Sequence, residues 1–346
     1  MTADLTRLEE LVESFTKQTV VVLADFVADR FVSGEISRVS REAPVLILRH
    51  RETELLPGGG ANATNNLVDL GARVFPVAAI GDDKAGRALV DYFRKKNVDV
   101  SGLVRAKEWS TPVKTRYLAG WTHTTRQQVL RVDREPQTPL SAAVQQTLLK
   151  KAVQKIKRAG VLLASDYGFG SVTPLLVRSL RRSGGTKLKI TLDSRYCLGD
   201  YRNAGITAAT PNESELESMH HARIGNGSTS VEKLGQLTLK SLRLDALIVT
   251  RGKDGMVVFE RNKKPKQIPV YGSDEAADVT GAGDTVIAVF SLALAAGATY
   301  SEAAELANYA AGIVVMKRGT ATVRREELLA ALRNEATGTN RTFLKT

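Results

Sequence analysis

The sequence predicts an α/β fold built on a mostly parallel central sheet, with a small β-lid beside it. Three observations support this prediction. Short apolar strands alternate with helices over most of the 346 residues. Several of these strands end in Asp, Asn or Thr, as expected where the carboxyl ends of parallel strands form a ligand site. Residues 31–57 and 112–133 break this alternation with paired extended segments, which predicts the separate lid.

A helix and a buried strand open the chain. Apolar residues recur at helical spacing from Leu5 to Phe15, which predicts an amphipathic helix over residues 4–17 that could pack on a partner. Residues 19–24 are almost wholly apolar, as in a strand buried within a parallel sheet. The other elements expected before residue 140 are lid strands at 31–36 and 45–50, a helix to Leu70 that closes at Gly71, a strand at 74–80, a helix at 84–96, and extended segments at 112–120 and 126–133.

The alternation of helix and strand resumes after Leu140. We expect helices at 140–158, 173–183, 231–242, 285–297 and 301–316, and strands at 161–165, 188–192, 206–209 and 245–250. The basic run at 261–266 is typical of a solvated hairpin tip. The chain is therefore expected to comprise an amino-terminal helix over 1–18, one domain over 19–335 that includes the lid, and a polar tail over 336–346 that frays from Thr337.

The composition is that of an ordinary globular protein with a sizeable core, at 43% hydrophobic and 25% charged residues. The single cysteine, Cys197, excludes an intrachain disulfide and a cysteine-based metal cluster. No apolar run approaches the roughly 18 residues that a membrane helix needs, and the first residues do not resemble a signal peptide. We therefore expect a soluble, cytoplasmic protein that does not bind a membrane.

The net charge of +12 favours anionic partners, either nucleic acid or phosphorylated metabolites. The basic residues are spread along the chain, and few aromatic side chains interleave with them. This pattern disfavours a nucleic-acid binder, which would show steep salt-dependent retention on DNA. A small phosphorylated ligand is the preferred interpretation.

The stretch from Asp278 to Thr285 (Asp-Val-Thr-Gly-Ala-Gly-Asp-Thr) precedes an apolar helix that ends at Gly297. Its glycines let the backbone N–H groups of residues 281–284 surround an anion, and the helix dipole adds positive charge there. A carboxylate at Asp284 suits this place if it takes a proton from a hydroxyl while the N–H groups receive a phosphoryl group. The alternative is a capped core helix whose Gly-x-Gly is only a tight turn.

Two other loops carry candidate ligands. Asp25, Asp29 and Arg30 follow the first strand, although Asp29 and Arg30 could form only a local ion pair. The loop at 57–66 contains three consecutive glycines, which allow close approach of a ligand, and Asn62, which can both donate to and accept from hydroxyls. This loop matches neither the dinucleotide pattern nor the P-loop pattern.

These motifs resemble those of the ribokinase-like (PfkB) sugar kinases from about residue 19 to about 333, and within that family those of the heptose 7-phosphate kinases of ADP-heptose synthesis. Ser37-Arg38-x-Ser40-x-Glu42-Ala43-Pro44-Val45 matters most, because general sugar kinases of the family lack it. The other matching stretches are Asp25-x-x-x-Asp29-Arg30-Phe31, Pro57-Gly58-Gly59-x-Ala61-Asn62, Lys114-Thr115-Arg116, Gln127-Gln128-x-x-Arg131-x-Asp133, Ser165-Asp166-Tyr167, Thr210-Pro211-Asn212-Glu213-x-Glu215, Thr250-Arg251-Gly252-x-x-Gly255, residues 278–285 and Gly319-Thr320-Ala321-Thr322-Val323.

The resemblance implies a three-layer α/β/α sandwich and an ATP-dependent carbohydrate kinase that transfers a phosphoryl group to an alcohol. It implies ATP and Mg²⁺ as cofactors, a monovalent cation as a further candidate, and a homodimer formed through the β-lid. The implied catalytic residues are Asp284 as base and Gly281, Ala282 and Gly283 as anion hole. The implied sugar-binding residues are Asp25, Asp29, Arg30, Gly58, Gly59, Asn62, Lys114, Arg116, Arg131 and Asp133. Asn212 and Glu215 are implied to organise Mg²⁺ and phosphate, and Asn212, Thr250, Arg251, Gly252, Gly255 and Asn308 to hold the nucleotide.

The inferred lid carries basic residues that could bind a phosphate already present on the sugar, since arginine matches phosphate oxygens with two hydrogen bonds. These residues are Arg38, Arg41, Lys114, Arg116 and Arg131. The alternative is a solvated basic face without a ligand.

The sequence departs from the heptose kinase pattern at three places. Ala24 stands where that pattern has Gly, Phe169 where it has Lys, and Asp193-Ser194-Arg195 where it has Asp-Pro-Lys. The best candidate substrate is heptose 7-phosphate, phosphorylated to the 1,7-bisphosphate, but another sugar, sugar phosphate or nucleoside stays open. A non-catalytic sugar- or nucleotide-binding regulator is a further alternative. No His-x-Gly-His occurs, so no nucleotidyltransferase half is expected.

Overall fold

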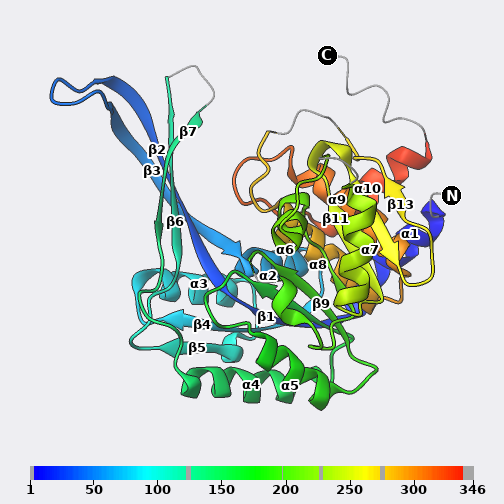
Figure 1. Cartoon of the computed structure of the whole chain (residues 1–346). Coiled ribbons are helices and arrows are strands. Elements are labelled where there is room, and N and C mark those ends of the chain that lie inside the picture. Colours follow the sequence, from blue (N-terminus) through cyan, green and yellow to red (C-terminus); the bar gives the residue numbers. More distant parts are fainter. Residues whose placement is uncertain (1–3, 122–125, 197, 226–228, 273–276, 338–346) are drawn as a thin grey trace.

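A nine-stranded sheet forms the centre of the computed structural model, which describes residues 4–121, 126–196, 198–225, 229–272 and 277–337 (Figure 1). The strand order is β13-β12-β11-β10-β9-β8-β1-β4-β5, parallel from β11 to β5 and antiparallel at β12 and β13. The strands are β1 (Thr19–Ala24), β4 (Arg73–Gly81), β5 (Leu103–Ala106), β8 (Val161–Asp166), β9 (Lys189–Ser194), β10 (Ala208–Ala209), β11 (Ala246–Thr250), β12 (Met256–Glu260) and β13 (Lys266–Ile268).

Helices cover both faces of this sheet, which confirms the predicted α/β fold. The α-helices are α1 (Leu5–Glu13), α2 (Gly60–Asp69), α3 (Lys84–Lys95), α4 (Ala142–Ile156), α5 (Pro174–Gly184), α6 (Glu213–His220), α7 (Val231–Ser241), α8 (Ala282–Ala295), α9 (Tyr300–Val314) and α10 (Arg325–Ala336); short 3₁₀ helices are η1 (Ser14–Lys17), η2 (Val100–Gly102), η3 (Leu198–Tyr201) and η4 (Gly252–Asp254). Among the described residues, none of these helices is long and apolar enough to cross a membrane.

Strand β1 shows how the sheet divides the core into two layers. Its side chains alternate between faces, so Val20 and Val22 join one buried cluster and Val21 and Leu23 the other. The first cluster includes side chains of α1, α2, α3, α8, α9 and α10, and the second includes side chains of α4, α5, α6 and α7. A strand buried on both faces explains the almost unbroken apolar run that the sequence shows here.

The lid is a second sheet of four strands in the order β3-β2-β6-β7 that stands off the core (Figure 1). Its strands are β2 (Phe26–Val39), β3 (Leu46–Gly59), β6 (Val113–Gly120) and β7 (Gln127–Arg134). The sequence predicted four lid strands but placed the first at 31–36, because no turn residues separate the buried residues 26–29 from β1. The lid is buried at its root and exposed along the whole of β7.

The amino-terminal helix packs within the chain. Leu8, Leu11 and Val12 are buried in the core, and the Arg333 side chain of α10 donates to Glu9 at 3.0 Å. The apolar face predicted to meet a partner is therefore already covered by this chain.

Other differences from the expected elements concern short segments. Strands β5, β12 and β13 and helices α6 and α10 were not predicted, and β10 is only two residues long. The basic run ends in Lys266, whose ammonium contacts Glu305, and residues 261–265 form the turn between β12 and β13. Residues 338–346 of the predicted polar tail lie outside the described residues.

Candidate functional site

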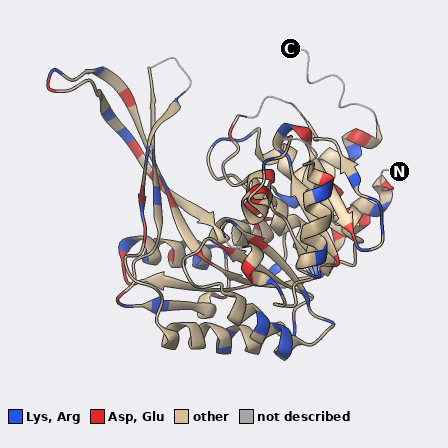
Figure 2. Cartoon of the chain, viewed as in Figure 1, with Lys and Arg blue, Asp and Glu red and all other residues tan. Residues whose placement is uncertain are grey.

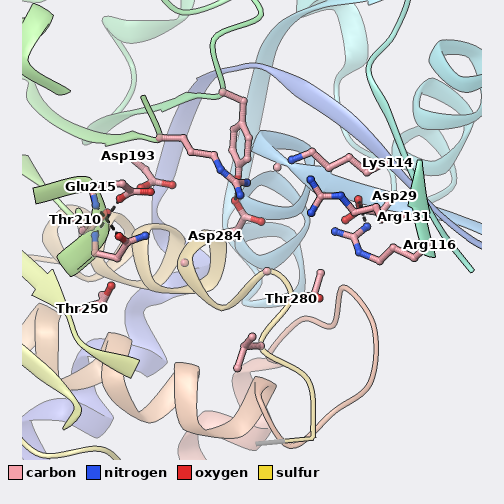
Figure 3. A pocket seen from close by; sticks show the side chains of 17 residues that line it. Asp29, Lys114, Arg116, Arg131, Asp193, Thr210, Glu215, Thr250, Thr280 and Asp284 are labelled. Atoms are coloured by element: carbon pink, nitrogen blue, oxygen red, sulfur yellow. Dashed lines mark hydrogen bonds and ion pairs between the residues drawn. The ribbon is translucent and has the colours of Figure 1, made fainter. Parts of the chain in front are cut away.

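A cavity of about 440 Å³ lies between the carboxyl edge of the central sheet, the root of the lid and the start of α8 (Figure 3). Its position agrees with the ligand site of open α/β sheets, outside the carboxyl ends of the strands. The lining residues are Asp29, Gly59, Lys114, Arg116, Arg131, Tyr167, Asp193, Arg195, Thr210, Asn212, Glu215, Thr250, Val279, Thr280, Gly281, Gly283 and Asp284.

Helix α8 begins inside the predicted motif, at Ala282, and its apolar run is buried as far as Leu294. Gly281 has a φ of +80°, and a Cβ there would lie 2.5 Å from the Asn62 amide nitrogen, so both backbone and packing require glycine. The N–H of Ala282 donates to the carbonyl of Val279 at 3.3 Å. Within the described residues the N–H groups of Gly283 and Asp284 have no protein acceptor, which leaves two donors and a helix dipole for an anion.

Asp284 lies at this helix start with only 4% of its surface exposed. Its carboxylate accepts a hydrogen bond from the Tyr167 hydroxyl at 2.7 Å and another from the Asn62 amide at 3.1 Å. Burial raises the pKa of Asp284 to about 6, while these two hydrogen bonds oppose the rise. The carboxylate is thus ionised at neutral pH and more basic than a solvated one, which suits a general base.

The lid wall of the cavity is built around a buried ion pair. Arg116 donates to Asp29 at 2.5 Å, and the hydroxyl of Thr320 donates to the other Asp29 oxygen at 2.9 Å. Gly58 makes room for this pair, because a Cβ there would lie 2.5 Å from the Asp29 carboxylate. The Arg116 guanidinium also lies 5.4 Å from the centre of the Phe31 ring. Asp29 therefore pairs across the lid with Arg116 and not with its neighbour in sequence, Arg30.

Two further cations face the cavity from the lid, and one from the core. Lys114 lies 5.0 Å from the centre of the Tyr167 ring, and the guanidinium of Arg195 lies 5.8 Å from it. Burial and the charge of Arg195 lower the pKa of Lys114. Arg131 donates twice to Asp133, at 2.9 and 2.7 Å. These cations give one end of the cavity the charge that an anionic group would need.

The opposite side of the cavity is acidic. Asn212 and Glu215 form a capping box at the start of α6, in which one Glu215 oxygen accepts from the Asn212 N–H at 2.9 Å. Asp193 lies nearby: burial and the charge of Glu215 raise the pKa of Asp193 well above its usual value, and burial raises that of Glu215. The described residues contain no cluster of three or more His, Cys, Asp or Glu side chains that could hold a metal ion unaided. Paired carboxylates facing a cavity suit Mg²⁺, which keeps several waters and shares substrate phosphates.

An apolar slot of about 320 Å³ adjoins the cavity and shares Thr250, Val279 and Gly283 with it. Most of its lining is aliphatic or glycine, as a nucleotide base requires. It is lined by Thr250, Gly252, Lys253, Gly255, Met256, Val270, Val279, Ala282, Gly283, Val286, Asn308, Ala311, Gly312 and Val315. Because Gly283 lines both spaces, the start of α8 lies between the slot and the cavity.

Most of the predicted site residues meet in these two spaces, but several do not. The Asp25 carboxylate is completely buried and accepts from the N–H groups of Tyr167, Phe169 and Ser171 at 2.8 to 3.0 Å, so it anchors this loop and does not line the cavity. The predicted residues outside the lining of both spaces are Asp25, Arg30, Arg38, Arg41, Gly58, Asn62, Asp133 and Arg251.

These outlying residues have other positions in the structure. Asn62 donates to Asp284, Gly58 packs against the Asp29 carboxylate, and Asp133 accepts from Arg131. Each of these three residues thus contacts a side chain that lines the cavity. Arg251 does not line the slot and donates to Glu213 at 2.6 Å. Arg38 and Arg41 are exposed in the outer part of the lid.

Sequence reasoning did not assign site roles to Tyr167, Asp193, Arg195, Thr210 and Thr280, all of which line the cavity. Asp166 and Asp193 directly follow the predicted strands at 161–165 and 188–192, and the rule that ligands bind at the carboxyl ends of strands also points to their neighbours Tyr167 and Arg195. The contact of Tyr167 with Asp284 joins residues 117 positions apart, and no local pattern reveals it.

The amino-acid sequence is similar to a family model and to curated proteins. The model of the pfkB family carbohydrate kinases matches residues 18–327. The "Bifunctional protein HldE" of Paramagnetospirillum magneticum is 37% identical over 335 residues, which are 96% of this chain and 67% of that protein. The HldE of Geobacter metallireducens is 37% identical over 314 residues, which are 90% of this chain and 62% of that protein. The chain thus spans about two thirds of the length of the curated relatives it matches.

Solved structures share the fold at lower identity. Escherichia coli phosphofructokinase-2 in complex with fructose-6-phosphate superposes with a TM-score of 0.75 and 18% identity, covering 92% of this chain and 99% of that one. Arabidopsis thaliana ribokinase complexed with ribose and ATP gives 0.69 and 18%, covering 91% and 98%. Since the family model spans most of the chain and the curated relatives reach 37% identity, this chain belongs to the pfkB family of carbohydrate kinases.

Proposed function

We propose that the chain is an ATP-dependent, Mg²⁺-dependent kinase whose acceptor is a hydroxyl of a sugar that already carries a phosphate. One observation carries this proposal: the buried carboxylate Asp284 lies at the start of α8, between an apolar slot on one side and the lid cations Lys114 and Arg131 on the other. An adenine base fits the slot, and a sugar phosphate fits the cationic end. Heptose 7-phosphate, phosphorylated to the 1,7-bisphosphate, is the best candidate.

The geometry supports a single in-line transfer. The acceptor hydroxyl gives its proton to Asp284, its oxygen bonds to the γ-phosphorus of ATP, and the bond from that phosphorus to the ADP oxygen breaks. The N–H groups of Gly283 and Asp284 would stabilise the negative charge on the moving phosphoryl group. Asn212 and Glu215 would hold Mg²⁺ through water, and the ion neutralises the charge on the ATP phosphates when bound.

The choice of a heptose phosphate rests on the sequence resemblance of residues 37–45 and on the similarity to the HldE proteins. Its weak point is the pair of positions where Phe169 and Arg195 replace lysines of the heptose kinase pattern. Arg195 keeps a positive charge in the cavity lining, whereas Phe169 carries no charge and packs against the core outside that lining. A kinase for another sugar, another sugar phosphate or a nucleoside is therefore the second candidate. It is favoured by the loss of charge at Phe169.

Four further proposals concern a cofactor, the assembly, the anionic partner and the location. A monovalent cation is a candidate activator, since a fold neighbour, Escherichia coli phosphofructokinase-2, has been solved in complex with potassium. A homodimer through the lid is supported by the exposed edge strand β7, where Val129, Leu130 and Val132 are 46 to 55% exposed. Basic residues intersperse with acidic ones in the view of Figure 2, which supports a metabolite and not nucleic acid as the anionic partner. We also keep the proposal of a cytoplasmic location.

A coupled ADP-release assay with Mg-ATP tests the proposed function. The acceptor panel contains heptose 7-phosphates, fructose 6-phosphate, ribose, fructose and nucleosides, and Asp284→Asn protein serves as the blank. Clear preference for one phosphorylated sugar supports the cationic end of the cavity as a phosphate site. Preference for an unphosphorylated sugar retains Asp284 as base but contradicts that site. ADP release that is equal in the Asp284→Asn blank would contradict the proposed function as a whole.

A further inference from the structure

The loop after strand β8 places an aromatic hydroxyl directly on the carboxylate assigned as base. We propose that Tyr167 is a positioning residue, whose hydroxyl fixes the Asp284 carboxylate and sets the pH range in which it accepts the sugar's proton. This inference rests on the proposed function, because it takes Asp284 to be the base. It adds a role for a residue that neither the sequence motifs nor the anion-hole geometry assigns.

The two oxygens of Asp284 are held by different donors. The Tyr167 hydroxyl donates to Oδ1 at 2.7 Å, and the Asn62 amide donates to Oδ2 at 3.1 Å. These two bonds fix the rotation of the carboxylate about its χ2 torsion, which is otherwise broad. Each oxygen keeps a second lone pair, so the acceptor hydroxyl can bind without displacing either donor.

The Tyr167 ring is itself held firmly. The backbone N–H of Tyr167 donates to Asp25 at 3.0 Å, and the same carboxylate accepts from the backbone N–H groups of Phe169 and Ser171, so a buried group fixes the backbone of this loop. A Cβ at Gly59 would lie 3.2 Å from the ring, and the φ of Gly59 is +54°. The position of the ring is therefore set by Asp25 and Gly59 as well as by its contact with Asp284.

Charged groups from several elements face Asp284 and Tyr167. Lys114 of the lid and Arg195 after β9 pack on the Tyr167 ring. Asp29 and burial raise the pKa of Asp284, whereas Tyr167, Asn62 and Lys114 lower it. Asp193 and Asp284 disfavour ionisation of Tyr167, and burial raises the pKa of its hydroxyl well above the usual value, so it stays a hydrogen-bond donor.

The test replaces the hydroxyl alone. Tyr167→Phe keeps the ring and its packing, and Tyr196→Phe is the matched control, since Tyr196 is 69% exposed and its ring also lies 5.8 Å from Arg195. The carboxyl band of Asp284 is read as the infrared difference between each protein and its Asp284→Asn counterpart, titrated from pH 4 to 8. Loss of a donor to a buried carboxylate should raise the midpoint by about one pH unit.

Turnover gives the second measurement, on the sugar that the acceptor panel selects. In Tyr167→Phe the acid limb of kcat should move up with the infrared midpoint. With a pKa that moves from about 6 to about 7, kcat at pH 6 falls about fivefold from titration alone, and the fall shrinks by pH 8. Tyr196→Phe should match wild type in both measurements.

The outcomes separate this inference from the function on which it rests. An unmoved infrared midpoint in Tyr167→Phe would overturn the inference, whatever the activity. A moved midpoint with an unchanged acid limb of kcat would overturn it as well, because the contact would then not govern the reaction. Full turnover by Asp284→Asn would instead overturn the role of Asp284 as base, and the proposed mechanism with it.

Discussion

The sheet edge and the lid contribute opposite charges to the same cavity. The core side supplies the carboxylates Asp193, Glu215 and Asp284 together with the cation Arg195. The lid supplies Lys114, Arg116 and Arg131, of which Arg116 pairs with Asp29 and Arg131 with Asp133. The core carboxylates are buried enough for their pKa values to be raised. The outer lid is exposed, and β7 contributes no buried side chain.

This difference in burial separates catalysis, at the sheet edge, from substrate binding, at the lid. A base needs a raised pKa and a fixed orientation, which only a packed environment provides. Recognition of a charged substrate needs cations that are solvated by water when no substrate is bound. A sheet on the protein surface provides such cations. We therefore expect changes at the sheet edge to lower turnover or alter stability, and changes at the lid to alter substrate binding, except at the lid's buried root.

The largest effect is expected from the core. Asp284→Asn removes the proton acceptor with little change of shape, so kcat should fall by about 10³-fold while ATP still binds. Single-turnover phosphoryl transfer and ATP titration measure the two quantities. Asp91→Asn makes the same replacement of a carboxylate by a carboxamide at an exposed position on α3. It is the matched control and should leave kcat unchanged. If kcat of Asp284→Asn lies within a few-fold of the wild-type value, Asp284 is not the general base and catalysis does not depend on this core residue.

The root of the lid should behave like the core and not like its tip. Arg116→Met leaves Asp29 buried without its ion-pair partner, and the two residues are only 8% and 3% exposed. Loss of one member of such a pair costs about 3 kcal/mol of unfolding free energy. Denaturant unfolding measures this, with Arg51→Met as control.

Arg51 pairs with Glu35 farther along the same lid, where the Arg51 side chain is 56% exposed. Breaking that exposed pair should cost about 0.5 kcal/mol at most. Equal destabilisation by Arg51→Met and Arg116→Met would show that root and tip do not differ in the way their burial indicates. The double variant Asp29→Asn/Arg116→Met should recover part of the loss, because it removes the unpaired charge.

A smaller effect links the base to stability. Asp284 has a pKa of about 6 in the folded protein against 3.8 as the usual value, so the folded state binds a proton more tightly than the unfolded state. Its contribution is therefore most favourable below pH 3.8 and is lost as pH rises through about 6, at a cost of at most about 3 kcal/mol.

Asp284→Asn removes that cost, although its amide now faces the donor Asn62. We expect a net stabilisation of about 1–2 kcal/mol at pH 8 that disappears near pH 4. Thermal unfolding of both proteins across this range measures the difference. A variant less stable than wild type at pH 8, or an advantage that grows toward acid, would contradict the raised pKa.

The sequence predicted the sheet edge better than the lid contacts, for physical reasons. Strand β1 and the start of α8 have local signatures, an apolar run and a Gly-Ala-Gly turn, so their place and the role expected of Asp284 could be read directly. Contacts between distant segments have no such signature. Asp25 resembles a ligand in sequence, yet three backbone N–H groups of the loop after β8 occupy it.

The same reason explains the omissions. Tyr167 lies next to a recognised strand end, but only the fold brings it to Asp284. Arg251 lies in a recognised motif, but it donates to Glu213 and does not line the slot. The extra length of β2 was missed because its buried first residues continue the apolar character of β1. Local patterns thus predict which loops form the site, and packing decides which side chains of those loops face it.

The smallest effect is expected from a lid cation that faces the cavity, Lys114. Lys114→Met removes a cation that faces the cavity without an ion-pair partner among the described residues, so no buried charge is stranded. If this ammonium binds the phosphate of the sugar, KM for the phosphorylated sugar should rise about tenfold with kcat nearly unchanged, which corresponds to one charge-assisted hydrogen bond. KM for the same sugar without its phosphate should stay as in wild type. Lys150→Met, an exposed change on α4, is the control. A fall in kcat with unchanged KM would contradict this role. Lys114 would then contribute to catalysis, acting on Asp284 through the Tyr167 ring, and catalytic function would not be confined to the sheet edge.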